Sequence, residues 1–139
     1  SVTLEMRNRM PEIVDASVAA EAFAEQAGAD PSVVFNINLV LDELLTNIVN
    51  YAYDDDAEHV IAIRMSVAGD RLSLEIIDDG RAFDPLAEVT EPDLDLDAED
   101  RPIGGLGVFF VRQTMNSVDY QRENNHNVLR MWTSLTGQA

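Results

Sequence analysis

The chain has 139 residues, of which 46% are hydrophobic and 25% charged, a size and composition that indicate one globular domain and exclude a largely disordered chain. Cysteine is absent, which excludes disulfides, thiolate metal centres and a cysteine nucleophile. The formal net charge of −17 makes nucleic acid a poor partner and favours a basic protein segment.

All nine basic residues are arginines. An acidic surface repels phosphate at long range, so we expect any phosphate ligand to be bound locally by a helix N-terminus, a metal ion or an arginine. No run of about 18 apolar residues occurs, and the N-terminal sequence SVTLEMRNRM lacks the apolar segment of a signal peptide. These features predict a cytoplasmic protein with no membrane partner.

Two helices are predicted after a short N-terminal strand. Residues 11–27 are rich in alanine, begin with proline at a favourable first helical position and are followed by Gly28. The next segment starts with Asp30, Pro31 and Ser32 and extends to about Tyr51. Its apolar residues recur at helical spacing, at Ile37, Val40, Leu41, Leu44, Leu45, Ile48 and Val49.

Strands dominate the predictions for the rest of the chain. Alternating residues at 59–67 and 72–76 predict a hairpin with a Gly69-Asp70 turn. Residues 88–101 are crowded with acids and are predicted to form a loop, and a glycine-rich sequence then opens a third helix. The tail predicts a second hairpin that turns at residues 124–127.

This order of elements predicts an α+β fold. We expect a two-layer α/β sandwich, in which a mostly antiparallel, mixed sheet carries its helices on one face. Residues 1–139 are predicted to form a single domain.

Three segments of this predicted fold carry polar groups suited to ligand binding. Glu43 and Asn47 are four residues apart on the second helix, so they project within about 40° of one another beside its apolar stripe. The sequence from Asp78 to Pro85 follows a buried strand and offers a carboxylate and a glycine. Gly104 to Gly107 precede the third helix, whose free N–H groups can bind phosphate oxygens.

Each segment alone has an ordinary structural interpretation. A Glu and an Asn on one helix face commonly form a surface pair. Asp-Gly is a frequent turn sequence, and a glycine cluster before a helix is often a flexible loop.

Taken together, the three segments resemble the adenine-nucleotide-binding domain of gyrase-type ATPases, Hsp90, MutL and histidine kinases. The most similar branch is the anti-sigma-factor serine/threonine kinases. LVLDELLTNIVNYAY resembles the first box of that family, IIDDGRAFDP the second and GGLGVFFVRQTMNSVDY the third. The resemblance covers essentially the whole chain and implies a Bergerat-type ATP-binding fold.

The resemblance also implies a role for individual residues. Asn47 would hold the Mg²⁺ that bridges the ATP phosphates, Glu43 would act as the base or orient the attacking group, and Asp78 would accept from the exocyclic amine of adenine. Gly80 and Ala82 would give the base room. The phosphates would be lined by Gly104, Gly105, Leu106 and Gly107, and an acidic lid at about residues 86–104 would cover the nucleotide.

Lysine, which the resemblance places near the phosphates, is absent, so Arg101 or Arg81 is the candidate for that contact. The lid is unusually acidic. Neither histidine lies in a two-helix dimerisation segment, which argues against a self-phosphorylating histidine kinase, and His59 and His126 are expected to be surface residues.

The resemblance implies an ATP- and Mg²⁺-dependent serine/threonine protein kinase that acts as an anti-sigma factor. Such a protein phosphorylates a small anti-sigma antagonist, sequesters a sigma factor, and can form a homodimer through its first strand and first helix. The alternative is a nucleotide-gated protein-binding module without productive kinase activity.

Overall fold

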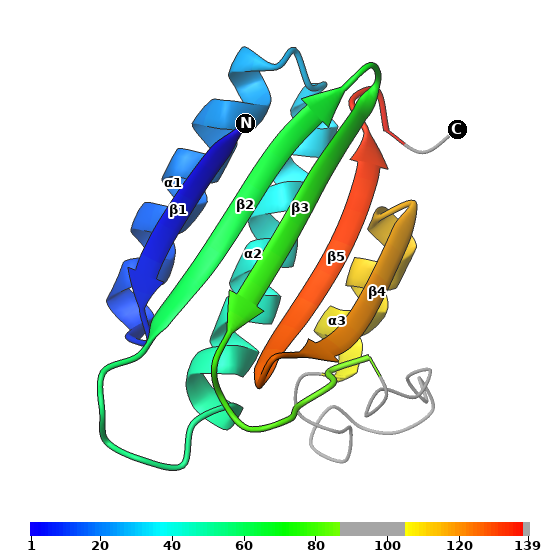
Figure 1. The fold of residues 1–139 in the computed structure, drawn as a ribbon. Helices are drawn as coiled ribbons and strands as arrows, with labels where there is room; N and C mark the ends of the chain where they lie inside the picture. The colour runs from blue at the N-terminus through cyan, green and yellow to red at the C-terminus, as the bar shows by residue number, and fades with distance from the viewer. Residues whose placement is uncertain (87–104, 138–139) are drawn as a thin grey trace.

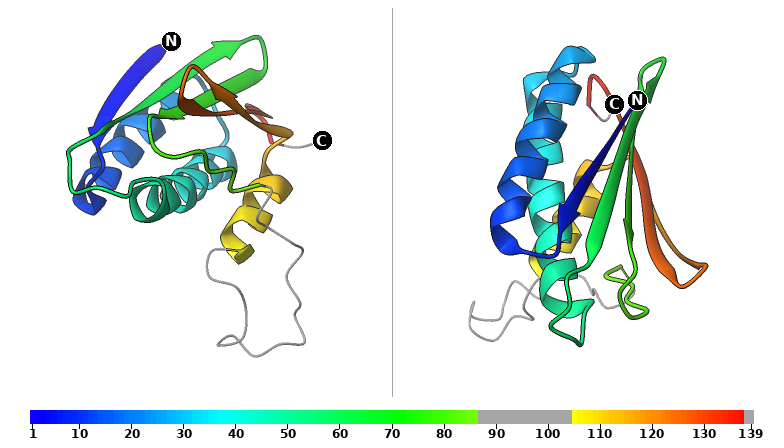
Figure 2. Two further views of the ribbon diagram at one scale, coloured as in Figure 1. Left: turned by 60° about the horizontal axis from the view of Figure 1, so that its bottom comes forward. Right: turned by 60° about the vertical axis from the view of Figure 1, so that its left-hand side comes forward.

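The structure, a computed structural model, describes residues 1–86 and 105–137. Five strands form one sheet in the order β1-β2-β3-β5-β4, and every pairing among them is antiparallel. The strands are β1 (Val2–Arg7), β2 (Val60–Ala68), β3 (Arg71–Asp78), β4 (Ser117–Glu123) and β5 (His126–Ser134). Helices α1 (Met10–Gln26), α2 (Pro31–Tyr51) and α3 (Gly105–Thr114) cover one face of the sheet (Figures 1 and 2). The predicted two-layer α+β fold is confirmed, with antiparallel pairs alone in the described sheet.

The core lies between the helices and the covered face of the sheet. The apolar stripe of α2 packs there against alternate residues of β2 and β3, because side chains of a strand point to opposite faces in turn. The largest fully buried side chains are Val33, Ile37, Val40, Leu41, Leu44, Leu45, Ile61, Ile63, Met65, Leu72, Leu74 and Ile76. Helix α2 has a mean hydropathy of 1.4 and is long and apolar enough to cross a membrane. In this structure, however, its apolar side faces the core.

Both hairpin turns use backbone conformations that their residues favour. Gly69, between β2 and β3, has a φ of +61°. Asn124 and Asn125, between β4 and β5, have φ of 51° and 64°, the left-handed pair of a two-residue hairpin turn. Strand β5 begins directly after this turn, so Asn127 lies in the strand and not in the turn predicted for residues 124–127.

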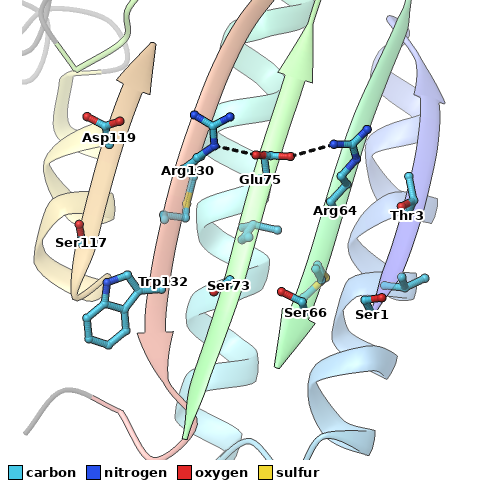
Figure 3. A pocket seen from close by; sticks show the side chains of 14 residues that line it. Ser1, Thr3, Arg64, Ser66, Ser73, Glu75, Ser117, Asp119, Arg130 and Trp132 are labelled. Atoms are coloured by element: carbon cyan, nitrogen blue, oxygen red, sulfur yellow. Dashed lines mark hydrogen bonds and ion pairs between the residues drawn. The ribbon is translucent and has the colours of Figure 1, made fainter. Parts of the chain in front are cut away.

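The other face of the sheet is its polar face, where charged and hydroxyl side chains project from neighbouring strands (Figure 3), and no helix of the described residues covers it (Figures 1 and 2). Glu75 on β3 accepts from Arg64 on β2 at 3.2 Å and from Arg130 on β5 at 2.8 Å, so ion pairs cross three neighbouring strands. A depression of about 470 Å³ lies on this face between Ser66, Trp132 and the ion pairs of Glu75, and both apolar and polar side chains line it. The three ligand-binding segments predicted from the sequence contribute no residue to it.

Candidate nucleotide site

The first part of the candidate site is a pair of side chains on α2. Asn47 Nδ2 donates to Glu43 Oε1 at 3.2 Å, as expected for residues one helical turn apart. Asn47 is buried and Glu43 is half-buried, which places the pair at the edge of the core. Burial raises the pKa of Glu43, the hydrogen bond from Asn47 lowers it, and the nearby Asp42 raises it further. The amide oxygen of Asn47 has no hydrogen-bond partner among residues 1–86 and 105–137.

The second part is Asp78, the last residue of β3, whose side chain is only 3% exposed. Its Oδ1 accepts from the backbone N–H of Gly80 and from Asn127 Nδ2, both at 2.9 Å. Within the described residues Oδ2 has no hydrogen-bond partner. Burial raises the pKa of Asp78, while the two hydrogen bonds lower it. One carboxylate oxygen is thus fixed by the protein and the other is free to accept from a ligand.

Gly80 brings the end of β3 against the end of α2. A Cβ atom at this position would lie 2.4 Å from the carbonyl oxygen of Ala52, so only glycine fits without a shift of the backbone. The N–H of Arg81 donates to the same oxygen at 2.8 Å. Gly80 therefore packs against the helix end, and its role of making room for a base stays a prediction. Ala82 is exposed beside it.

This contact brings the first two segments to one end of the molecule. Asn47 precedes Ala52 by five residues, which is about 7.5 Å along the helix axis. The N-terminus of α3 lies at the same end, below the arrowhead of β3 (Figure 1). Gly105, Leu106 and Gly107 form the first turn of α3. Gly104, Arg101 and nearly all of the predicted lid lie outside the described residues.

Arg81, the other candidate for the phosphate contact, binds the end of α2 through its Nε. Its Nε donates to the carbonyl oxygen of Tyr51 at 2.8 Å, and it lies 3.9 Å from a carboxylate oxygen of Asp54. The guanidinium therefore caps the C-terminus of α2, where a positive charge stabilises the helix dipole.

Sequence reasoning missed the residues that hold Asp78. Asn127 is 3% exposed and lies opposite Asp78 in the β3–β5 register. Tyr120 and Arg122, both on β4, donate to the side-chain oxygen of Asn127. The asparagine-rich sequence 124–127 resembled a turn throughout. Asp78 and Asn127 meet through the pairing of β3 with β5, which no local sequence pattern predicts.

His59 was expected to be a surface residue, but its side chain is only 18% exposed. Its Nε2 lies 2.8 Å from Asp55 and its Nδ1 3.2 Å from Asp79, and its ring stacks on Tyr53. Because each ring nitrogen faces a carboxylate, the hydrogen bonds and charges of Asp55 and Asp79 raise the pKa of His59 and favour its protonated form. The expectation holds for His126, which is exposed.

The geometry fits an adenine nucleotide with a divalent cation. The free Asp78 oxygen can accept from an exocyclic amine, and the free Asn47 oxygen is a hard ligand of the kind Mg²⁺ prefers. In the described part of the chain, no three His, Cys, Asp or Glu side chains form a metal-binding group. A cation here would therefore take most of its ligands from phosphate oxygens and water.

Comparison with known proteins supports the same interpretation. The family described as histidine kinase-like ATPase domain matches residues 8–133. The serine/threonine-protein kinase BtrW of Bordetella bronchiseptica is 30% identical over 129 residues, which cover 93% of this chain and 90% of the relative. The serine-protein kinase RsbW of Listeria monocytogenes is 25% identical over 84% of this chain and 76% of the relative. The anti-sigma F factor of Clostridium perfringens is 26% identical over 79% of this chain and 78% of the relative.

A solved structure shows the same fold. The RsbU and RsbW domains of a Mycobacterium tuberculosis protein, determined by crystallography, match with a TM-score of 0.64 at 14% sequence identity. The match covers 95% of this chain and 32% of the other, so this chain spans about a third of that protein's chain.

Proposed function

The chain belongs to the histidine kinase-like ATPase domains and, among them, to the anti-sigma kinase family, and on this premise we propose that it is an ATP-dependent serine/threonine protein kinase that acts as an anti-sigma factor. Its substrate would be a serine or threonine of a small anti-sigma antagonist, and its second partner a sigma factor. The observation that carries the proposal is the free oxygen of the otherwise fixed Asp78 carboxylate, at the same end as Glu43 and Asn47.

Each residue of the site has one task in this proposal. Asp78 Oδ2 accepts from the exocyclic amine of adenine and so selects ATP over GTP, whose base has a carbonyl oxygen at that place. Asn47 Oδ1 binds Mg²⁺, and the N–H groups of the first turn of α3 donate to phosphate oxygens. When bound, ATP supplies the phosphoryl group and Mg²⁺ neutralises its charge.

Glu43 serves the phosphoryl acceptor. It would orient the attacking hydroxyl and take its proton as the new oxygen–phosphorus bond forms and the bond from the γ-phosphorus to the leaving ADP breaks. Its hydrogen bond from Asn47 is to Oε1, and among the described residues Oε2 has no partner and can take that proton. Half-burial of Glu43 favours this role, because partial desolvation makes a carboxylate a stronger base.

The test is transfer of radiolabelled phosphate from ATP to a purified antagonist encoded beside this protein, with Mg²⁺ and with Mg²⁺ chelated. Label on a serine or threonine of the antagonist, lost on chelation, supports the kinase. Tight ATP binding without transfer to any cognate antagonist would contradict it and favour the nucleotide-gated binding module. Equal affinity for ATP and GTP would contradict the role of Asp78.

A further inference from the structure

Arg122 on the edge strand β4 makes two hydrogen bonds that reach the candidate nucleotide site. Its Nη1 donates to the carbonyl oxygen of Gly80 at 2.8 Å and to Asn127 Oδ1 at 3.1 Å. Gly80 lies two residues after Asp78 and 42 residues before Arg122 in sequence. One guanidinium nitrogen therefore ties the edge of the sheet to the turn that follows Asp78.

Asn127 links Arg122 to Asp78 through hydrogen bonds at the two ends of its amide. Its Oδ1 accepts from Arg122, from the N–H of Phe83 at 3.1 Å and from the hydroxyl of Tyr120. Arg122 and the N–H of Phe83 can only donate hydrogen bonds, so the amide oxygen of Asn127 must face them. The amide nitrogen of Asn127 then points the opposite way. That nitrogen donates to Asp78 Oδ1 at 2.9 Å and to the carbonyl oxygen of Arg81 at 2.7 Å.

We propose that Arg122 is a positioning residue for nucleotide recognition, which orients the Asn127 amide and the Gly80 carbonyl so that Asp78 presents its free oxygen to the adenine amine. This proposal rests on the proposed function for its ligand. Arg122 acts through Asn127 and Gly80 and makes no direct hydrogen bond to Asp78.

The charge of Arg122 acts in the same direction as its hydrogen bonds. Burial raises the pKa of Asp78; the hydrogen bonds of Asn127 and of the Gly80 N–H lower it, the adjacent carboxylate of Asp79 raises it, and the positive charge of Arg122 lowers it. Among the described residues, the hydroxyls of Tyr53 and Tyr120 are also titratable groups near Asp78. Arg122 thus favours the ionised carboxylate, which accepts at both oxygens.

The test compares Arg122→Gln, Arg122→Lys and the matched control Arg130→Gln. Arg130, on β5, is bound to Glu75 and Glu123 on the polar face, so Arg130→Gln removes one positive charge without touching Asn127. Two measurements are made on each variant: ATP affinity by calorimetry, and the pKa of Asp78 by carbon-13 NMR titration of the nucleotide-free protein.

In Arg122→Gln we expect ATP affinity to fall about tenfold, the loss for one hydrogen bond from a charged group. We expect the pKa of Asp78 to rise. The loss of ATP affinity that accompanies protonation of Asp78 should then begin at a higher pH. Arg122→Lys, which keeps the charge and a donor, should recover part of both. If Arg122→Gln does not fold, Arg122→Lys is compared with Arg130→Gln. We then expect a partial loss of ATP affinity in Arg122→Lys and none in Arg130→Gln.

Equal ATP affinity and an equal Asp78 pKa in Arg122→Gln and Arg130→Gln would overturn the proposal, since a merely structural arginine would lower thermal stability alone. If the unmodified protein binds no ATP, the proposed function fails. The NMR titration then still decides the part that concerns Arg122 and Asp78, because it needs no nucleotide.

Discussion

Asp78 and Asn127 face each other across the β3–β5 pairing, and the amide nitrogen of Asn127 donates to one carboxylate oxygen of Asp78 at 2.9 Å. The two residues are 49 apart in sequence. This bond fixes the carboxylate, so its second oxygen has a defined direction before any ligand arrives. Preorganisation of this kind lowers the entropic cost of binding.

The Asp78→Asn variant tests this arrangement. Its amide can keep an oxygen toward Gly80 and Asn127, but its nitrogen then faces the adenine amine, donor against donor. We expect ATP affinity to fall about 10- to 100-fold, the cost of leaving a buried donor unpaired. The difference between the affinities for ATP and for GTP should become smaller. Calorimetry with both nucleotides measures this, and unchanged discrimination would show that Asp78 does not contact the base.

Gly80→Ala tests the contact between β3 and α2. The new methyl group would lie 2.4 Å from the Ala52 oxygen, so the turn must shift, and we expect a loss of about 1–3 kcal/mol in unfolding free energy together with weaker ATP binding. Gly69→Ala is the matched control. Its φ of +61° makes that variant strained too, but Gly69 lies in the β2–β3 turn, away from Ala52. An equal loss of ATP affinity in the two variants would contradict this explanation.

His59 predicts a dependence of stability on pH. Its hydrogen bond to Asp55, and then the hydrogen bond and charge of Asp79, raise its pKa above the unfolded value of 6.5. A raised pKa means that protonated His59 stabilises the fold in full below pH 6.5, and that this contribution is lost as the pH rises through the folded pKa. Denaturant unfolding at several pH values measures it.

The comparison for His59 is between His59→Gln and His126→Gln. His126 is exposed, and its Nδ1 contacts a backbone carbonyl oxygen instead of a carboxylate. The difference in unfolding free energy between unmodified protein and His59→Gln should shrink as the pH rises, whereas the difference for His126→Gln should stay small. A constant difference for His59→Gln across the range would contradict a charged His59.

Asn47→Ala should weaken nucleotide binding in the presence of Mg²⁺ much more than in its absence, because it removes an oxygen ligand of the cation. Calorimetry with ATP in Mg²⁺ and with a chelator measures the two affinities. The neighbouring Asn50→Ala is the control, since Asn50 is exposed on the same helix. If chelation changes the affinity of Asn47→Ala as strongly as that of the unmodified protein, Asn47 does not bind the metal.

Local patterns were sufficient to predict the elements of this fold, because the buried stripe of α2 and the alternation in β2 and β3 are periodic in sequence. They also predicted that Glu43 and Asn47 share a face, since a helix fixes that relationship. The partners of Asp78 could not be found in this way. Asn127 reaches Asp78 only through strand pairing, and Gly80 meets Ala52 only through packing, and neither contact leaves a periodic signal.

His59 shows the same limit. Its neighbours Tyr53 and Asp55 are near in sequence, but Asp79 comes from the end of β3 and completes the charged cluster only after the sheet has formed. A histidine among acids in a short connection looks like a solvated residue until both of its ring nitrogens are seen to be paired.

In the proposed mechanism this chain transfers phosphate and Glu43 takes part in the transfer. The most direct test measures, for the unmodified protein and Glu43→Gln, both ATP affinity and the rate of radiolabelled phosphate transfer to the cognate antagonist. Glutamine keeps the size of the side chain and an oxygen that can accept from Asn47, but it is not a base. If Glu43 is the base, we expect nearly unchanged ATP affinity and a transfer rate reduced by about 10²- to 10⁴-fold. Transfer by Glu43→Gln at the unmodified rate would contradict it.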